Sequence, residues 1–154
     1  MKTLLAGLAL ALAVSGSAAR TQPAGSGQQT IVNDPAALAR LRHNSGITLQ
    51  WISFHQPGRG HLTVTDRGRL VHLHGSQTQN DSAGRVDIDG DLLSIDARSF
   101  TFRGRISIEN SPDPDRECMR DGTYEFRATG TRRYWRLQNI EACDGLADYV
   151  DIYF

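Results

Sequence analysis

The chain has 154 residues, and its 17 lysine and arginine residues balance 17 acidic residues, so the formal net charge is zero. This balance argues against a nucleic-acid-binding protein, because neutralising phosphates requires a surplus of cations. Its composition, with 39% hydrophobic and 22% charged residues, is typical of a globular protein, and the length suits one domain.

The N-terminus has the pattern of a secretory signal peptide over residues 1–19. Lys2, the only lysine, precedes an apolar run from Leu4 to Val14, and Ser17-Ala18-Ala19 supplies the small residues of a cleavage site. The run is too short for a transmembrane helix, which needs about 20 apolar residues, so no transmembrane segment is expected. The sequence therefore predicts an exported bacterial protein, periplasmic or secreted, whose mature chain begins at Arg20.

The chain contains two cysteines, Cys118 and Cys143. An even number of cysteines in an exported protein favours a disulfide, because export leads to an oxidising compartment. A metal-binding pair and a reactive thiol are the alternatives, and both the long spacing and the oxidising compartment argue against them. We expect a Cys118–Cys143 disulfide.

A flexible leader over residues 20–32, rich in Gln, Gly, Ser and Pro, is expected before the folded domain. A short helix is predicted over Asn33–Arg42, because Asn33 or Asp34 can cap its start, Pro35 suits its first turn and Gly46 ends the segment. This helix begins a single domain that comprises residues 33–154.

From Ile47 onward, apolar and polar side chains alternate with the two-residue period of β-strands. The pattern predicts a first strand over Ile47–Phe54, a long strand over Ser99–Glu109 and a last strand over Asp148–Phe154. Three hairpins are expected, with turns at Arg67-Gly68, Gly90-Asp91 and Gly130-Thr131. The cross-strand pairs expected in the first and third hairpins are Leu62 with Leu73, Val64 with Val71, Phe126 with Trp135, Tyr124 with Leu137, and Arg136 with Glu125.

About nine such strands joined by tight turns predict an all-β fold, a meander that forms a small barrel, with a β-sandwich as the alternative. This architecture over residues 47–154 is similar to lipocalin-like (calycin) barrels. The G-x-W and T-D-Y motifs of that family correspond here to Gly46 and Trp51, which lie further apart, and to Ala147-Asp148-Tyr149, which lacks the Thr. The last third of the chain, with Tyr134-Trp135-Arg136-Leu137-Gln138, Cys143 and the segment from Asp148 to Phe154, resembles small uncharacterised exported bacterial β-domain proteins.

Three histidines form the candidate metal site. If Leu62 pairs with Leu73, then His61 lies opposite His74 and Thr63 opposite His72, all on the outer face of the sheet, within reach of one another. Three neutral imidazoles can bind Zn²⁺ or Cu²⁺. The alternative is a polar outer face that happens to use histidine, and no other cofactor is indicated.

Three functions remain open. The first is a non-enzymatic exported barrel that binds a small ligand in its interior, the second is an interaction protein that docks on a cell-envelope partner through its loops, and the third is a metal-dependent activity at the histidine patch. We expect a monomer. A barrel interior filled by Trp51, Phe100, Phe102, Phe126 and Trp135 leaves no cavity and favours the second function over the first.

Overall fold

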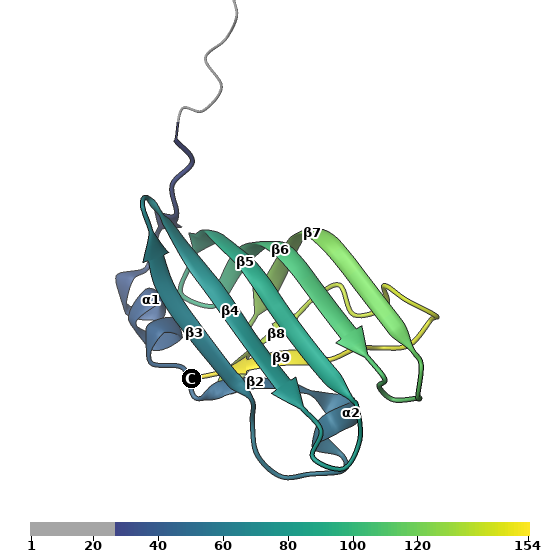
Figure 1. The fold of residues 1–154 in the computed structure, drawn as a ribbon. Helices are drawn as coiled ribbons and strands as arrows, with labels where there is room; N and C mark the ends of the chain where they lie inside the picture. Colours follow the sequence, from purple (N-terminus) through teal and green to yellow (C-terminus); the bar gives the residue numbers. More distant parts are fainter. Residues whose placement is uncertain (1–26) are drawn as a thin grey trace, which may run out of the picture.

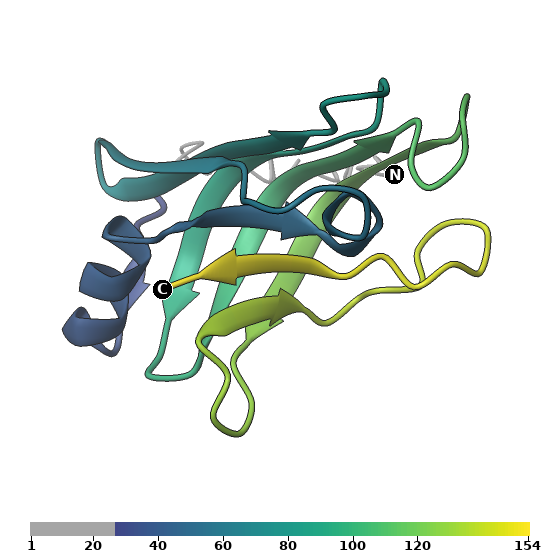
Figure 2. The same cartoon turned by 90° about the horizontal axis from the view of Figure 1, so that it is seen from below.

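The computed structural model describes residues 27–154, so the predicted signal peptide over residues 1–19 and the first part of the predicted leader lie outside the described residues. The described chain folds into a nine-stranded sheet that curls into a nearly closed barrel, with two short helices beside it (Figures 1 and 2). This confirms the predicted all-β barrel-like fold.

Eight strands follow one another across the sheet with antiparallel neighbours. In order across the sheet they are β2 (Gly46–Leu49), β9 (Val150–Tyr153), β8 (Tyr134–Leu137), β7 (Glu117–Arg127), β6 (Ser99–Glu109), β5 (Arg85–Ile95), β4 (Leu70–Thr78) and β3 (His61–Arg67). The ninth strand, β1 (Ile31–Val32), pairs in parallel with the end of β5. Figure 2 shows the two sides of the curled sheet, with β2, β9 and β8 facing the longer strands.

The helix predicted near the N-terminus is present as α1 (Pro35–Arg42). The Asp34 carboxylate caps it by accepting a hydrogen bond from the backbone N–H of Ala37, and Ala37 and Leu41 are fully buried. The segment before α1 differs from the expected flexible leader. The Thr30 hydroxyl donates to the carbonyl of Leu92 and accepts from the backbone N–H of Val71, which ties this segment to β4 and β5.

Two backbone hydrogen bonds bridge the remaining gap between β2 and the loop that enters β3, the two ends of the sheet. The backbone N–H of Gly60 donates to the carbonyl of Ile47 at 2.8 Å, and the N–H of Ile47 donates back at 3.4 Å. Glycine at position 46 makes this approach possible, because a Cβ there would lie 2.2 Å from the carbonyl oxygen of Gly60. Gly60 in turn lies against β4, where its Cβ would come within 1.9 Å of the carbonyl oxygen of Ser76. We call the junction between β2 and this loop the seam.

Large aromatic side chains fill the barrel interior. Four of them are at most 1% exposed: Phe100, Phe102, Phe126 and Trp135. The rings of Phe100 and Phe126 stack with centroids 4.8 Å apart, and the Trp135 ring meets Phe100 edge-on at 5.6 Å. These four aromatics confirm most of the predicted interior, while Trp51 is only partly buried, in the helical turn α2 (Gln50–Ser53). This turn replaces the second half of the first strand that was predicted over Ile47–Phe54.

A row of glycines makes room for these rings. Gly90, Gly104 and Gly122 lie side by side on β5, β6 and β7. The Phe102 ring covers the first two so closely that a Cβ there would come within 3 Å of it. The predicted turn at Gly90-Asp91 is therefore wrong: β5 runs through this point without interruption, and its glycine serves packing instead.

The other two predicted hairpins exist, but their registers were wrong by two residues. The first turns at Gly68-Arg69, so that Leu62 lies opposite Gly75 and Val64 opposite Leu73. In the third, Phe126 lies opposite Leu137 rather than Trp135. Arg136 consequently pairs with Asp151 across β8 and β9, with hydrogen bonds of 2.7 and 2.8 Å, and not with Glu125.

Candidate functional site

The corrected register divides the predicted histidine patch. His61 lies opposite Ser76 at the start of β3, while Thr63 lies opposite His74 and Thr65 opposite His72. Only His72 and His74 remain together, on the outer face of β4. Within residues 27–154, no group of three or more His, Cys, Asp and Glu side chains stands in an arrangement that could hold a metal ion.

Each of the two remaining histidines faces an aspartate of β5. His72 lies opposite Asp91, with its Nδ1 3.0 Å from the carboxylate, and His74 lies opposite Asp89 at the same distance. His72 is 3% exposed, and its Nε2 has no hydrogen-bond partner among residues 27–154, although it lies 3.5 Å from Asp89. Burial alone would raise the pKa of Asp89, but the hydrogen bond from His74 and the charges of both histidines outweigh burial, and the pKa is lowered.

The outer face next to these pairs forms a shallow hollow of about 430 Å³ with charges of both signs. Arg85 forms an ion pair with Asp87 from the neighbouring position on the same face of β5. The residues that line the hollow are His74, Arg85, Asp87, Asp89, Arg105, Ser107, Glu109 and Met119. Several of these charges already neutralise one another, so the hollow has no marked preference for one sign of ligand.

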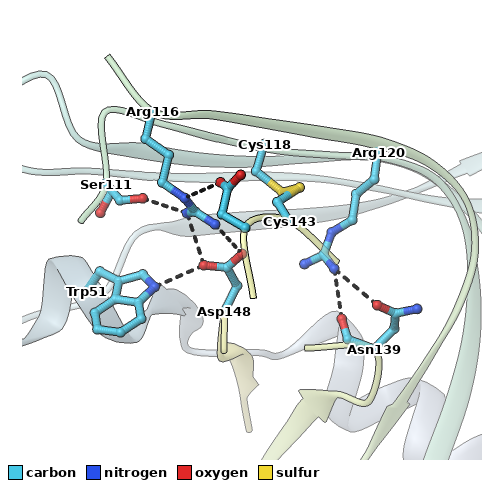
Figure 3. The surroundings of a disulfide bond; sticks show 9 residues. Trp51, Ser111, Arg116, Cys118, Arg120, Asn139, Cys143 and Asp148 are labelled. Atoms are coloured by element: carbon cyan, nitrogen blue, oxygen red, sulfur yellow. Dashed lines mark hydrogen bonds and ion pairs between the residues drawn. A yellow bond between two sulfur atoms is a disulfide. The ribbon is translucent and has the colours of Figure 1, made fainter. Parts of the chain in front are cut away.

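A buried ionic network lies beside the disulfide (Figure 3). Cys118 and Cys143 are bonded, as predicted. Arg116 donates to both oxygens of the Asp148 carboxylate, at 2.9 and 3.1 Å, and the indole N–H of Trp51 donates to the same carboxylate at 2.9 Å. Burial lowers the pKa of the Arg116 guanidinium, but the bonds and charge of Asp148, with help from Asp144, raise it above the ordinary value. The network ties the disulfide-closed loop to α2 and is structural.

Arg120 extends from β7 beside this network and is less well paired. Its Nη1 donates to the carbonyl of Asn139 at 2.8 Å, whereas its Nε and Nη2 are buried and find no hydrogen-bond partner in the described part of the chain. Burial lowers the pKa of this guanidinium, and burial also raises the pKa of the neighbouring Tyr124 hydroxyl. None of the cavities described here adjoins Arg120.

A hollow of about 870 Å³ lies on the outer surface over the seam and is larger than the hollow on the face of β4 to β6. We call it the seam pocket. Its lining comes from the segment between α1 and β2, from β2, α2 and β9, and from the start of β3 with the loop before it: Asn44, Ser45, Gly46, Thr48, Ser53, Gln56, Pro57, Gly58, Arg59, Gly60, His61, Leu62, Thr63 and Tyr153. A second hollow of about 330 Å³ adjoins the other side of the same loop and shares residues 56–61 with it.

Arg59 is the cation of the seam pocket. Its guanidinium lies over the Tyr153 ring, with 3.8 Å between Cζ and the ring centroid, and its Nη1 donates to the Ser45 hydroxyl at 2.6 Å. Stacking holds the planar group in one orientation. The Nε–Nη2 edge, which is the edge that grips carboxylates in bidentate fashion, has no partner among the side chains and backbone groups of residues 27–154.

The other polar groups of the seam pocket fall into two sets. Asn44, Gln56 and Thr63 support the backbone: Asn44 donates to the carbonyls of Leu41 and Leu62, Gln56 to that of Thr78 and the Thr63 hydroxyl to that of His74. His61 and the hydroxyls of Thr48, Ser53 and Tyr153 make no hydrogen bond within the described chain. These groups, with Arg59, are the ones that a ligand can use.

Among the residues that line the seam pocket, His61 was predicted as a functional residue, but in the metal patch with His72 and His74. Arg59 and Tyr153 lie 94 positions apart and meet only because β2 pairs with both β9 and the loop before β3. The local signal was the run Pro57-Gly58-Arg59-Gly60, an arginine held between glycines in a loop.

Taken together, a curled antiparallel sheet with a filled interior and an external polar pocket defines a small β-barrel domain. Within residues 27–154, none of the helices is both long enough and apolar enough to cross a membrane. The chain belongs to the PM1083 family, whose model matches residues 29–154. It is 38% identical over 108 residues to the uncharacterized protein PM1083 of Pasteurella multocida, a match that covers 69% of this chain and 68% of the relative. No solved structure matches the chain.

Proposed function

We propose that the protein is an exported, non-enzymatic barrel that binds a small polar ligand in the seam pocket. The observation that carries the proposal is the contrast between the interior and the seam. The interior is occupied by Phe100, Phe102, Phe126 and Trp135, whereas the seam pocket lies outside and is lined by polar groups that have no hydrogen-bond partner within residues 27–154. Ligand sites are typically concave, with a few converging polar groups that fix orientation.

Export is supported by the sequence pattern of residues 1–19 and fits a protein that carries a disulfide. The test is to express the full chain in a bacterium and separate periplasm and medium from cytoplasm. The exported form should begin at Arg20, which mass spectrometry of the intact protein checks. Accumulation of the uncleaved chain in the cytoplasm would contradict the proposal.

Ligand binding is tested by following backbone amide signals in ¹H–¹⁵N NMR while a panel of sugars, amino acids and dipeptides is added. Binding at the seam pocket should shift the amides of residues 45–48 and 59–63 and leave those of β6 unchanged. Native mass spectrometry of protein purified from the periplasm then asks whether a ligand or an envelope partner is retained. Shifts confined to the outer face of β4 and β5 would point to a different site and contradict the proposal.

An envelope protein is the second candidate partner. This alternative is favoured by Phe54, whose side chain is 71% exposed. Phe54 follows α2 and lies next to the loop that lines the seam pocket. A single exposed aromatic is common on protein surfaces, so the pocket remains the stronger argument.

A further inference from the structure

The seam pocket contains a cation, Arg59, and no carboxylate. All 17 acidic residues lie within residues 27–154, and none of them lines either the seam pocket or the hollow that adjoins it. Arg59 and His61 line both. The hollow on the outer face of β4 to β6 differs sharply, because Asp87, Asp89 and Glu109 line it.

This imbalance of charge has a direct electrostatic consequence for a ligand. A cation with no carboxylate beside it attracts an anion, and a concave surface strengthens that attraction because it limits screening by water and salt. The neutral groups of the pocket add directional hydrogen bonds and no competing negative charge. The chemistry of the pocket thus suits a ligand that carries a negative charge.

Arg59 also restricts the shape of that negative group. Its Tyr153 stacking and its bond to Ser45 fix the guanidinium plane and occupy Nη1. The edge that remains presents two parallel N–H donors from Nε and Nη2, which matches the two oxygens of a carboxylate. The hydroxyls of Thr48 and Ser53 and the imidazole of His61 are then available for further polar atoms of the same molecule.

We infer that the seam pocket binds a hydroxylated carboxylate, such as a uronic acid, with the carboxylate on the Nε–Nη2 edge of Arg59 and the hydroxyls on the neighbouring polar side chains. This inference rests on the proposed function and names the chemical class of its ligand. Arg59 acts as the charge-recognising residue, and Tyr153 and Ser45 hold it in place.

The experiment compares acids with neutral sugars of otherwise the same structure. D-glucuronate and D-galacturonate, and D-glucose and D-galactose as their uncharged counterparts, are titrated into the ¹⁵N-labelled protein, and dissociation constants come from the amides of residues 45–48 and 59–63. We expect at least one acid to bind about tenfold more tightly than its neutral counterpart, the effect of one charge-assisted bidentate contact. Raising the salt concentration should weaken only the binding of the acids.

Two variants separate recognition from stability. Arg59→Gln should reduce the affinity for the acid about tenfold and leave the affinity for the neutral sugar unchanged, while Arg103→Gln, an exposed arginine on the outer face of β6, should change neither. Equal affinities for acid and neutral sugar with no effect of Arg59→Gln would overturn the inference and leave the proposed function intact. Binding of the acids away from the seam, or no binding of either acid while another polar compound binds there, would also overturn it.

Discussion

Arg116 and Asp148 form a bidentate ion pair inside the protein, with hydrogen bonds of 2.9 and 3.1 Å. The Asp148 side chain is fully buried, and it also accepts a hydrogen bond from Trp51. The pair therefore joins the start of β7, the loop before β9 and α2 at one point.

Breaking this pair should strongly destabilise the protein. In Arg116→Leu the Asp148 carboxylate stays buried without its counter-charge, so the free energy of unfolding should fall by about 3–5 kcal/mol. Urea unfolding followed by circular dichroism measures this change. Arg127→Leu is the matched control, because Arg127 pairs with Glu125 at the surface, where a loss of no more than about 1 kcal/mol is expected.

A double variant tests the cause of that loss. Arg116→Leu combined with Asp148→Asn also removes the buried negative charge, so it should be more stable than Arg116→Leu alone. If the double variant is less stable by the sum of the single effects, the cost lies in packing and not in the stranded charge.

The Cys118–Cys143 disulfide closes a loop with a sequence separation of 25 residues. On the loop-entropy model, such a crosslink stabilises by about 3 kcal/mol through the unfolded state. The variant with both cysteines changed to alanine should lose about this amount in urea unfolding, and a reducing agent should then have no further effect on it. A loss below about 1 kcal/mol would show that the Arg116–Asp148 network holds this loop without the crosslink.

The loop that enters β3 passes so close to β4 that no side chain fits at Gly60. A Cβ there would lie 1.9 Å from the carbonyl oxygen of Ser76, so Gly60→Ala must push apart the backbones of the β3 entry and β4. We expect a loss of about 2–3 kcal/mol. Gly130→Ala is the control: nothing lies within 4 Å of its Cβ, and only its φ of 58° is strained, which costs about 1 kcal/mol. Equal losses in a thermal or urea melt would refute the claim that the close approach to β4 requires glycine at position 60.

The alternation of apolar and polar residues predicted the strands and their buried faces, but not how the strands pair. The strand over Ser99–Glu109 was predicted with its correct bounds and inward face, because Phe100 and Phe102 alternate with polar residues. Alternation does not fix the register, since a slip of two residues returns every side chain to its own face. That is why the first hairpin was predicted with Leu62 opposite Leu73 when its partner is Gly75.

The errors at the candidate site have the same origin. A slip of two residues moved His61 from the seam to a patch with His72 and His74. Gly90 indicated a turn, although it serves the packing of Phe102. Arg59 was not identified because its partner Tyr153 comes from the other end of the chain. The local pattern of apolar and polar residues defines which face of a strand is buried. Only the folded sheet determines which residues distant in the sequence come together.

The lowered pKa of Asp89 predicts how part of the free energy of unfolding depends on pH. Its pKa lies below the ordinary 3.8, chiefly because His74 donates to it. When the pKa of a carboxyl is lower in the folded state than in the unfolded state, the group stabilises the fold at pH values above its unfolded-state pKa. This contribution disappears as the pH falls through the folded-state pKa. Asp89→Asn should therefore be less stable than the parent protein at about pH 5 and equal to it at strongly acidic pH. Since the side chain is 46% exposed, the difference should stay below about 1 kcal/mol.

Urea unfolding at several pH values measures this difference, with Asp81→Asn as the control at an exposed aspartate that makes no hydrogen bond within the described chain. A gap between Asp89→Asn and the parent that grows toward acid pH would contradict the assignment.

Metal binding by histidine stays a prediction, and the structure changes which residues it depends on. His72 and His74 share Asp89 as a neighbour, and Asp91 orients His72 from its other ring nitrogen, an arrangement often seen where carboxylates support histidine ligands. His61 lies apart from them, opposite Ser76. Any affinity for Zn²⁺ should therefore fall at least tenfold in His72→Ala or His74→Ala and remain unchanged in His61→Ala. Calorimetric titration of Zn²⁺ into the parent and the three variants measures this. Equal, weak affinity in all four proteins would refute a histidine metal site on this sheet.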